Sequence, residues 1–428
     1  MANLFATLWN NYRAATIAAA VGLVAIVGVG GTLLLSGGES SSEQTTTATT
    51  TTAAAPAGPP LTPWPTYGFD NARTRYLPTK AVKPPFKVAW SYDARHLMEY
   101  SPIVAEGVVY GIDNNGEAFA LKAASGKQIW RRDVATLNAS APTYSDGKLY
   151  VSNLEPGQVQ ALNASSGRVA WRKSLAGRTE SSPLVVGNSV IAGCECGSVY
   201  AFNKRTGKQL WSTSVGGAVK ASPAFDKGTV FVGSYGGQMT ALSASNGAVR
   251  WTASAGGPIY GTASVAFGHV YVGTLTGGMN AFDERTGSQS WSTSTGGYVY
   301  SAAAAAQAPG TPPSVYFGSY SGTVYALNAL TGSVRWTQPT QGPVSGAGSV
   351  VGDVFYVGDL KTTQTFGFRA RDGKLVFEST DGAYNPVISD GRLLYMTGYR
   401  VIYALKPGRG KSESGFVVRG KKKARIAA

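Results

Sequence analysis

The chain has 428 residues, of which 43% are hydrophobic and only 14% are charged. This apolar content supplies a large core and excludes a wholly disordered chain. The 55 glycines favour many tight turns over long helices, and the two cysteines exclude a disulfide-dense scaffold or a multi-cysteine metal framework. The net charge of +15 would indicate a nucleic-acid-binding protein only if it covered the folded part of the chain.

Residues 14–35 form an uncharged and almost entirely apolar run near the N-terminus. As a helix this run would extend about 33 Å, at about 1.5 Å per residue, which is enough to cross a bilayer core. Arg13 precedes it and Glu39 and Glu43 follow it, so the positive-inside rule places residues 1–13 in the cytoplasm. The alternative is a cleaved signal peptide, but the run exceeds the usual length and no A-x-A site follows. We expect an uncleaved signal anchor, and therefore a single-pass cell-membrane protein whose folded domain is extracytoplasmic.

Two segments of biased composition flank the folded domain. Residues 36–62 are rich in Thr, Ser, Ala and Pro, which predicts a flexible tether. Residues 408–428 predict a solvated basic tail, and residues 406–428 alone carry a net charge of +7. The tail could alternatively contact an anionic envelope polymer, lipid headgroups or nucleic acid. Because the remaining body is only mildly basic, we expect no nucleic-acid partner.

Tryptophans recur about every forty residues through the rest of the chain. Six of them have an alanine ten residues earlier and a glycine four residues earlier, as in Ala201, Gly207 and Trp211. Phe377 continues the series with a glycine at both offsets. Repetition at this period indicates a solenoid or a propeller. The repeating residues, which we expect to pack between adjacent units, are Trp90, Trp130, Trp171, Trp211, Trp251, Trp291 and Trp336.

Each unit contains four short β-rich runs separated by Gly, Asn, Asp and Ser turns, which is the pattern of one propeller blade. The first run begins with Ser-Pro or a variant of it, and the fourth contains the tryptophan. No tryptophan run follows the last unit, whereas the run at residues 87–90 precedes the first unit. We therefore predict an all-β, eight-bladed propeller over residues 63–407, in which the N-terminal strand closes the last blade. Seven blades is the alternative, if the unit near Phe377 is degenerate.

The repeated unit resembles that of pyrroloquinoline-quinone-type (PQQ-like) β-propellers. It is clearest in AFNKRTGKQLW at residues 201–211 and ALNALTGSVRW at residues 326–336. WD repeats fit less well, because no aspartate follows these tryptophans. The stretch WPTYGFDNARTRY, from Trp64 to Tyr76, is similar to the segment that precedes the first blade in the same superfamily. The resemblance covers about 340 residues and implies the fold much more specifically than the function.

Two branches of that superfamily imply different functions. Quinoprotein dehydrogenases bind the quinone and calcium over the central channel, below a disulfide of adjacent cysteines, whereas BamB-type envelope assembly factors are non-catalytic docking surfaces. In this chain Glu195 separates Cys194 from Cys196, no calcium-ligand set can be mapped, and the long insertions of the enzymes are missing. The resemblance therefore implies a scaffold for envelope proteins or polymers, with no catalytic residue, metal or cofactor. The alternatives are a PQQ- and calcium-dependent alcohol or sugar dehydrogenase and a small-ligand sensor.

Candidate site residues follow from the aligned units. Cys194 and Cys196 occupy a turn, either as small turn residues or as a disulfide, and the chain offers no further ligands for a thiolate metal site. His96 and His269 fall in loops. Large aromatic and charged residues near the Ser-Pro positions would ring one opening of the channel, where they either form a ligand or peptide pocket or fill the channel. These residues are Glu99, Tyr100, Glu180, Lys220, Tyr260, Tyr300 and Tyr384.

Overall fold

The computed structural model describes residues 61–383 and 385–408, which form 33 β-strands and no helix. No segment of this described part could therefore cross a membrane as a helix. The anchor expected at residues 14–35 lies outside it. So do residues 1–13, all but the last two residues of the expected linker, Tyr384, and the tail from residue 409 onward.

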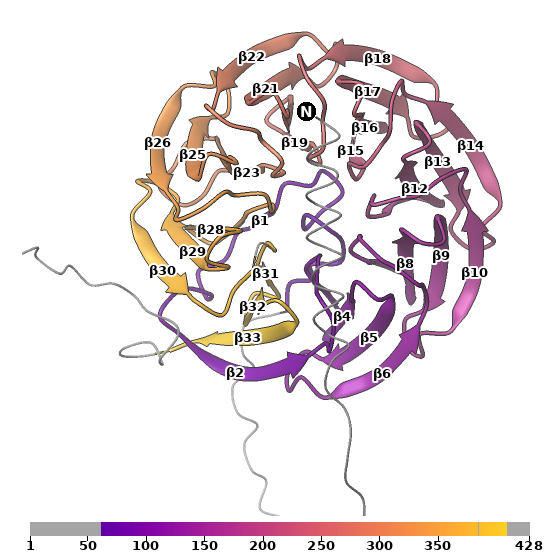
Figure 1. Cartoon of the computed structure of the whole chain (residues 1–428), viewed down its shortest axis with the longest axis horizontal. Coiled ribbons are helices and arrows are strands. Elements are labelled where there is room, and N and C mark those ends of the chain that lie inside the picture. The colour runs from indigo at the N-terminus through magenta and orange to yellow at the C-terminus, as the bar shows by residue number, and fades with distance from the viewer. Residues whose placement is uncertain (1–60, 384, 409–428) are drawn as a thin grey trace, which may run out of the picture. The chain divides into compact units, whose positions relative to one another are not determined.

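The strands form eight four-stranded antiparallel blades arranged as a ring about a common axis (Figure 1). In the first four blades the strands run from the axis outward as β3 (Ile103–Ala105), β4 (Val108–Ile112), β5 (Glu117–Lys122) and β6 (Gln128–Asp133); β7 (Thr143–Ser145), β8 (Lys148–Asn153), β9 (Gln158–Asn163) and β10 (Val169–Ser174); β11 (Leu184–Val186), β12 (Ser189–Cys194), β13 (Ser198–Asn203) and β14 (Gln209–Ser214); and β15 (Ala224–Asp226), β16 (Thr229–Gly233), β17 (Gln238–Ser243) and β18 (Val249–Ser254).

The remaining blades continue the order. Blades 5 and 6 are β19 (Ser264–Ala266), β20 (His269–Gly273), β21 (Gly278–Asp283) and β22 (Gln289–Ser294), then β23 (Ala304–Ala306), β24 (Ser314–Gly318), β25 (Thr323–Asn328) and β26 (Val334–Pro339). Blade 7 is β27 (Ser349–Val351), β28 (Val354–Gly358), β29 (Thr365–Arg369) and β30 (Leu375–Ser379), with β1 (Tyr76–Leu77) added in parallel to β27. Blade 8 is β31 (Ile388–Ser389), β32 (Leu394–Thr397), β33 (Val401–Pro407) and β2 (Phe86–Asp93).

The two ends of the propeller meet in blade 8. The N-terminal strand β2 pairs antiparallel with the C-terminal strand β33, from Phe86 opposite Pro407 to Asp93 opposite Val401. The purple and yellow strands lie side by side at the lower edge of Figure 1. This pairing confirms the predicted closure and the count of eight blades, and it leaves neither end of the ring as an open sheet edge.

The repeated tryptophan and glycine form one interlock between neighbouring blades. Trp211 of blade 3 donates its indole N–H to the Ala244 carbonyl of blade 4, at 3.2 Å. Gly247 of blade 4 lies so close over the same ring that a Cβ there would be 2.6 Å from it. Within blade 3, the repeated alanine Ala201 pairs with Trp211 across β13 and β14. The spacing seen in the sequence therefore combines a cross-strand pair with a contact to the next blade.

Phe377 of blade 7 replaces tryptophan at the one position in the described blades where the next blade offers no backbone carbonyl to accept an indole N–H. The third and fourth strands of blade 8, β33 and β2, come from opposite ends of the propeller and are joined by no turn. The turn that offers its carbonyl to an indole elsewhere is thus missing. Phe377 instead packs edge-on against Phe86, with ring centroids 5.6 Å apart. A ring without an N–H group suits this position, because a buried unpaired donor is costly.

Residues 62–77, here called the axial segment, run along the inside of the ring (Figure 1, indigo). Backbone or side-chain hydrogen bonds join this segment to an inner strand, or to the residue after it, in every blade. The contacted residues in blades 1 to 8 are Val104, Tyr144, Val185, Phe225, Val265, Ala305, Val350 and Asp390. In blades 1 to 7 the contact is the middle residue of the inner strand. The axial segment therefore holds all eight blades to one piece of backbone.

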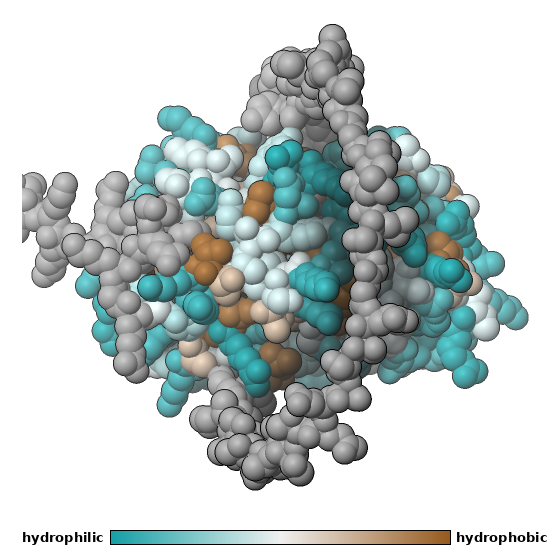
Figure 2. All heavy atoms as spheres, turned by 90° about the horizontal axis from the view of Figure 1, so that it is seen from below, coloured by the Kyte–Doolittle hydropathy of each residue, from teal (hydrophilic) through white to brown (hydrophobic). Residues whose placement is uncertain are grey.

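The outer rim carries scattered apolar side chains. On the side of the ring seen in Figure 2, brown patches alternate with teal and white ones. Several outer strands expose one aliphatic residue each, at Ile129, Val169, Leu210, Val249 and Val334. Singly exposed apolar residues of this kind are ordinary on a soluble surface and do not by themselves mark an interface.

Candidate functional site

The candidate site is the face of the propeller that the predicted ring residues share, here called the mouth face. In each antiparallel blade, the loop leading to the inner strand lies at the same end as the turn between the second and third strands. The mouth face is built from these loops and turns. Its opposite face carries the turns between the third and fourth strands, such as the one at Leu330.

One part of the mouth is a charged cluster around Lys220. The Lys220 ammonium contacts Glu180 Oε1 at 2.7 Å and Glu195 Oε1 at 2.8 Å. The Tyr260 hydroxyl donates to Glu180 Oε2, also at 2.7 Å. The Glu180 side chain is only 8% exposed, so its charge needs these partners. Three of the predicted residues thus lie in one hydrogen-bonded group.

A cluster of tyrosines continues from this charged group. Tyr260 packs edge-on against Tyr300, with centroids 5.6 Å apart, and Tyr300 packs against Tyr320 at 5.4 Å. Tyr235 contacts Tyr260 on the other side, and Tyr298 contacts both Tyr300 and Tyr320. Tyr298 is the most accessible of them, at 38% exposure. We call these five residues the tyrosine cluster.

Three phenols of this cluster, those of Tyr235, Tyr260 and Tyr300, stay protonated at neutral pH. Burial raises the pKa of Tyr300 to about 12, and burial together with the carboxylates of Glu180 and Glu195 raises that of Tyr235 to about 12. Burial and the hydrogen-bonded Glu180 hold the pKa of Tyr260 well above its ordinary value. The mouth therefore presents aromatic rings with hydroxyl donors rather than phenolates.

The other predicted ring residues are held differently. Glu99 accepts a hydrogen bond from the Asn114 side-chain amide at 2.7 Å, on the first blade. Tyr100 packs edge-on against Tyr67 of the axial segment, with centroids 5.6 Å apart. Tyr384 lies outside the described residues. The axial segment thus reaches the underside of the mouth.

Several mouth residues were not anticipated from the sequence. Glu195, Tyr235 and Tyr320 lie on turns between second and third strands, whereas the alignment considered only the loops before Ser-Pro. The repeated turns GSYGG and GSYSG carried the missing signal, because their tyrosines take the turn position that Glu195 holds in GCECG. Cys194 and Cys196 form a disulfide across Glu195, and the Cys196 amide donates to Cys194 Sγ at 3.1 Å. This bridge braces the turn that presents Glu195 to Lys220.

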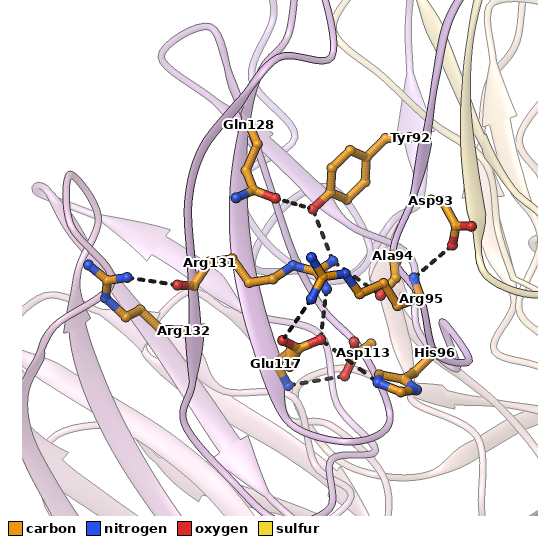
Figure 3. Close-up of polar contacts among 10 residues, drawn as sticks. All are labelled: Tyr92, Asp93, Ala94, Arg95, His96, Asp113, Glu117, Gln128, Arg131 and Arg132. Atoms are coloured by element: carbon orange, nitrogen blue, oxygen red, sulfur yellow. Dashed lines mark hydrogen bonds and ion pairs between the residues drawn. The ribbon is translucent and has the colours of Figure 1, made fainter. Parts of the chain in front are cut away.

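A second polar cluster lies between blades 8 and 1 (Figure 3). His96 from the loop after β2, Asp113 from the end of β4 and Glu117 from the start of β5 each bring one ligand atom within 4.8 Å of the others. Arg131 on β6 contacts Glu117 Oε2 at 2.7 Å. Asp113 is fully buried; its Oδ1 accepts the Glu117 amide, and its Oδ2 has no hydrogen-bond partner. The sequence predicted no metal site, and no signal in the repeat distinguished these three residues.

The pKa of Asp113 gives a first prediction. Burial raises it to about 6, although the Glu117 amide and the nearby His96 and Arg131 act in the opposite direction and Glu117 adds to the rise. A carboxyl whose pKa is higher in the folded state destabilises that state once it ionises. We expect Asp113→Asn to remove a stability loss of up to about 3 kcal/mol between about pH 4 and pH 6. Urea unfolding of the wild-type and Asp113→Asn chains in metal-free buffer at about pH 4, 5, 6 and 7 measures this stability difference. If the free energies of unfolding of the two chains change with pH in parallel, the prediction is contradicted.

Eight four-stranded blades, the tryptophan–glycine interlock and terminal closure define a PQQ-like β-propeller. The family profile described as outer membrane protein assembly factor BamB matches residues 81–218 and 195–413, so the chain belongs to this family. The structure of BamB from Moraxella catarrhalis superposes with a TM-score of 0.64 at 18% identity, covering 77% of this chain and all of that one.

Dehydrogenases share the same fold. The quinohemoprotein alcohol dehydrogenase from Comamonas testosteroni superposes with a TM-score of 0.67 at 17% identity, covering 84% of this chain and 83% of that one. In sequence, the 1-butanol dehydrogenase (cytochrome c) of Thauera butanivorans is 37% identical over 76 residues, which is 16% of this chain and 11% of that protein. The chain therefore spans about a tenth of this curated relative, and the structural likenesses show the fold alone.

Proposed function

We propose that this protein is a non-catalytic scaffold that binds a protein partner of the cell envelope through its mouth face. The observation that carries the proposal is the arrangement of the mouth residues: the charged side chains bind each other, and the tyrosine cluster lies beside them. Tyrosine is enriched in protein–protein contacts, because it offers a large rigid surface and a hydroxyl donor. Relatives described as assembly factors add support.

The mouth residues do not fit the quinone cofactor of the dehydrogenases. An anionic quinone needs a cation that is not already paired within the protein. Here Lys220 is held between Glu180 and Glu195. The two glutamates also outnumber the lysine, which makes this group anionic. The arrangement supports docking rather than oxidation chemistry.

We place the propeller outside the cytoplasm on a single-pass anchor, as part of the same proposal. The support is the apolar run at residues 14–35 with Arg13 before it and Glu39 after it. Protease added to spheroplasts should remove the propeller and leave a short membrane-bound N-terminal fragment. A fully protected propeller would contradict this orientation.

The docking proposal predicts that loss of the exposed tyrosines weakens partner capture. Crosslinking in intact cells, followed by quantitative mass spectrometry, should enrich the same envelope protein repeatedly with the wild-type chain. With Tyr298→Ser and Tyr300→Ser combined, we expect about 30-fold weaker binding and correspondingly less of that protein, since buried tyrosine anchors contribute about 2 kcal/mol at interfaces.

A matched control and a competing outcome make this test decisive. Leu330→Ser changes a residue that is 52% exposed on the opposite face, and it should leave capture unchanged. Equal losses with both variants would contradict docking at the mouth. A bound chromophore and alcohol-dependent dye reduction after adding pyrroloquinoline quinone and calcium would instead establish the dehydrogenase alternative.

A further inference from the structure

The cluster of His96, Asp113 and Glu117 combines an imidazole and two carboxylates, a donor set that binds divalent transition metals. The three side chains come from separate elements, the loop after β2 and the facing ends of β4 and β5, and point toward one another (Figure 3). We propose that they form a binding site for one divalent metal ion of the zinc type, distinct from the mouth residues around Lys220.

The unused oxygen of Asp113 is the observation that points to a ligand. Asp113 is 0% exposed, and its Oδ2 makes no hydrogen bond, although a buried carboxylate oxygen is normally satisfied. Asp359 holds the same turn position in blade 7, where both of its oxygens accept from the Thr362 hydroxyl at 2.7 and 2.9 Å. In blade 1 no such hydroxyl reaches Asp113 Oδ2. That oxygen therefore remains available to a metal.

The charge balance around Asp113 also favours a cation. Arg131 donates to Glu117 Oε2 at 2.7 Å, to the Tyr92 hydroxyl at 2.9 Å and to the Ala94 carbonyl at 3.1 Å. Arg95 Nη1 also lies 3.9 Å from Glu117 Oε1, so both guanidinium groups pair with Glu117. Among the described residues no cation forms a salt bridge with Asp113. One buried carboxylate is thus left without a counter-ion, which a divalent metal would supply.

The ligand atoms must draw together before they can bind an ion. Metal–oxygen and metal–nitrogen bonds are about 2.0–2.2 Å long, so two ligands of one ion lie no more than about 4.4 Å apart. The three ligand atoms here lie within 4.8 Å of one another, so a movement of a few tenths of an ångström brings them into range. His96, whose side chain is 43% exposed on a loop, is the residue that can move.

A metal here would fix part of the mouth face. Asn114, next to Asp113, donates to Glu99 on the same loop as His96. Bound metal would therefore tie the β4–β5 turn to residues 94–100, which include Glu99 and Tyr100. Arg131 would remain hydrogen-bonded to Glu117 while Glu117 binds the metal. Metal-bound carboxylates commonly keep such an additional hydrogen bond.

Zinc titration of the full-length chain tests the site. The protein is purified in detergent, its affinity tag is removed, and it is treated with chelator before calorimetric titration with zinc chloride. We expect one zinc ion per chain, and about 100-fold weaker binding with His96→Gln or with Asp113→Asn. Zinc should raise the thermal midpoint of the wild-type chain and leave that of His96→Gln unchanged.

Two control variants separate this site from general surface binding. His269→Gln removes the only other histidine, and Asp359→Asn removes the carboxylate at the matching turn of blade 7. Both should bind zinc like the wild-type chain. Unchanged affinity in His96→Gln, or equal losses in the controls, would overturn the proposal. If Asp113→Asn does not fold, the exposed His96 still supplies the deciding variant.

Discussion

Arg73→Met should lower the free energy of unfolding by about 3 kcal/mol, because it leaves several buried carbonyls without a donor. Arg73, on the axial segment, is 0% exposed. Its guanidinium donates to Pro223 O at 2.9 Å, to Pro183 O at 3.1 Å, to Thr66 Oγ1 at 2.6 Å and to Tyr67 O. It therefore joins the axial segment to the Ser-Pro turns of blades 3 and 4.

The size of this effect is limited by the cost of burying the charge. Burial, with Arg75 beside it, lowers the pKa of Arg73 to about 9. The charged form is thus already penalised in the folded protein, and removing the charge offsets part of the lost hydrogen bonding.

Arg75→Met is the matched control for this prediction. Arg75 is equally buried on the same segment, yet Nε and one terminal nitrogen have no hydrogen-bond partner. It donates to the Arg73 carbonyl and stacks over the Tyr67 ring at 4.7 Å. We expect Arg75→Met to shift the midpoint of urea unfolding by less than half as much as Arg73→Met. Equal shifts would show that burial, rather than the carbonyl contacts, determines the effect.

Gly247→Ala should destabilise the propeller by about 3 kcal/mol, because the added methyl group meets a neighbouring blade. Its Cβ would lie 2.6 Å from the Trp211 ring, and the residue has φ of +74°. Both the contact and the left-handed backbone oppose any side chain. Inner-strand contacts and the axial segment also hold the blades together, so the neighbouring blade cannot simply move away from the added methyl group.

Gly256→Ala separates the two contributions. Gly256 has the same φ of +74°, but a Cβ there would meet nothing within 4 Å. We expect it to cost about 1 kcal/mol, which is the backbone contribution alone. Thermal unfolding followed by tryptophan fluorescence measures both variants. A Gly247→Ala midpoint that matches that of Gly256→Ala would contradict the importance of the interlock.

The fold could be predicted because its information is local and repeated. Ala201, Gly207 and Trp211 hold their offsets since one cross-strand pair and one contact to an adjacent blade recur around the ring. The last repeat lacks its fourth strand, and an extra strand precedes the first repeat. Because the repeats are regular, this difference indicated that the two ends of the propeller pair. A period of about forty residues thus specified both the blades and how they join.

The site was only partly predictable, because its residues depend on contacts that do not repeat. Tyr260 and Lys220 were found as departures from small residues at an aligned position, whereas Glu195 lay on a turn outside that alignment. The sequence assigned no role to Arg73, since only the folded ring brings carbonyls of two blades to it. His96 lies in the loop after β2 and Asp113 in the turn between β4 and β5, so no repeated spacing connected them.

The order of the strands has a consequence for biosynthesis. The axial segment and β2 leave the ribosome first, yet the axial segment needs inner strands from all eight blades and β2 pairs with β33, the last strand to be made. The earliest part of the domain must therefore wait for the latest part, and pairing over such separations is slow. While the chain is being made, a large apolar surface stays uncovered, so this protein should depend on chaperones during synthesis more than a domain that folds blade by blade.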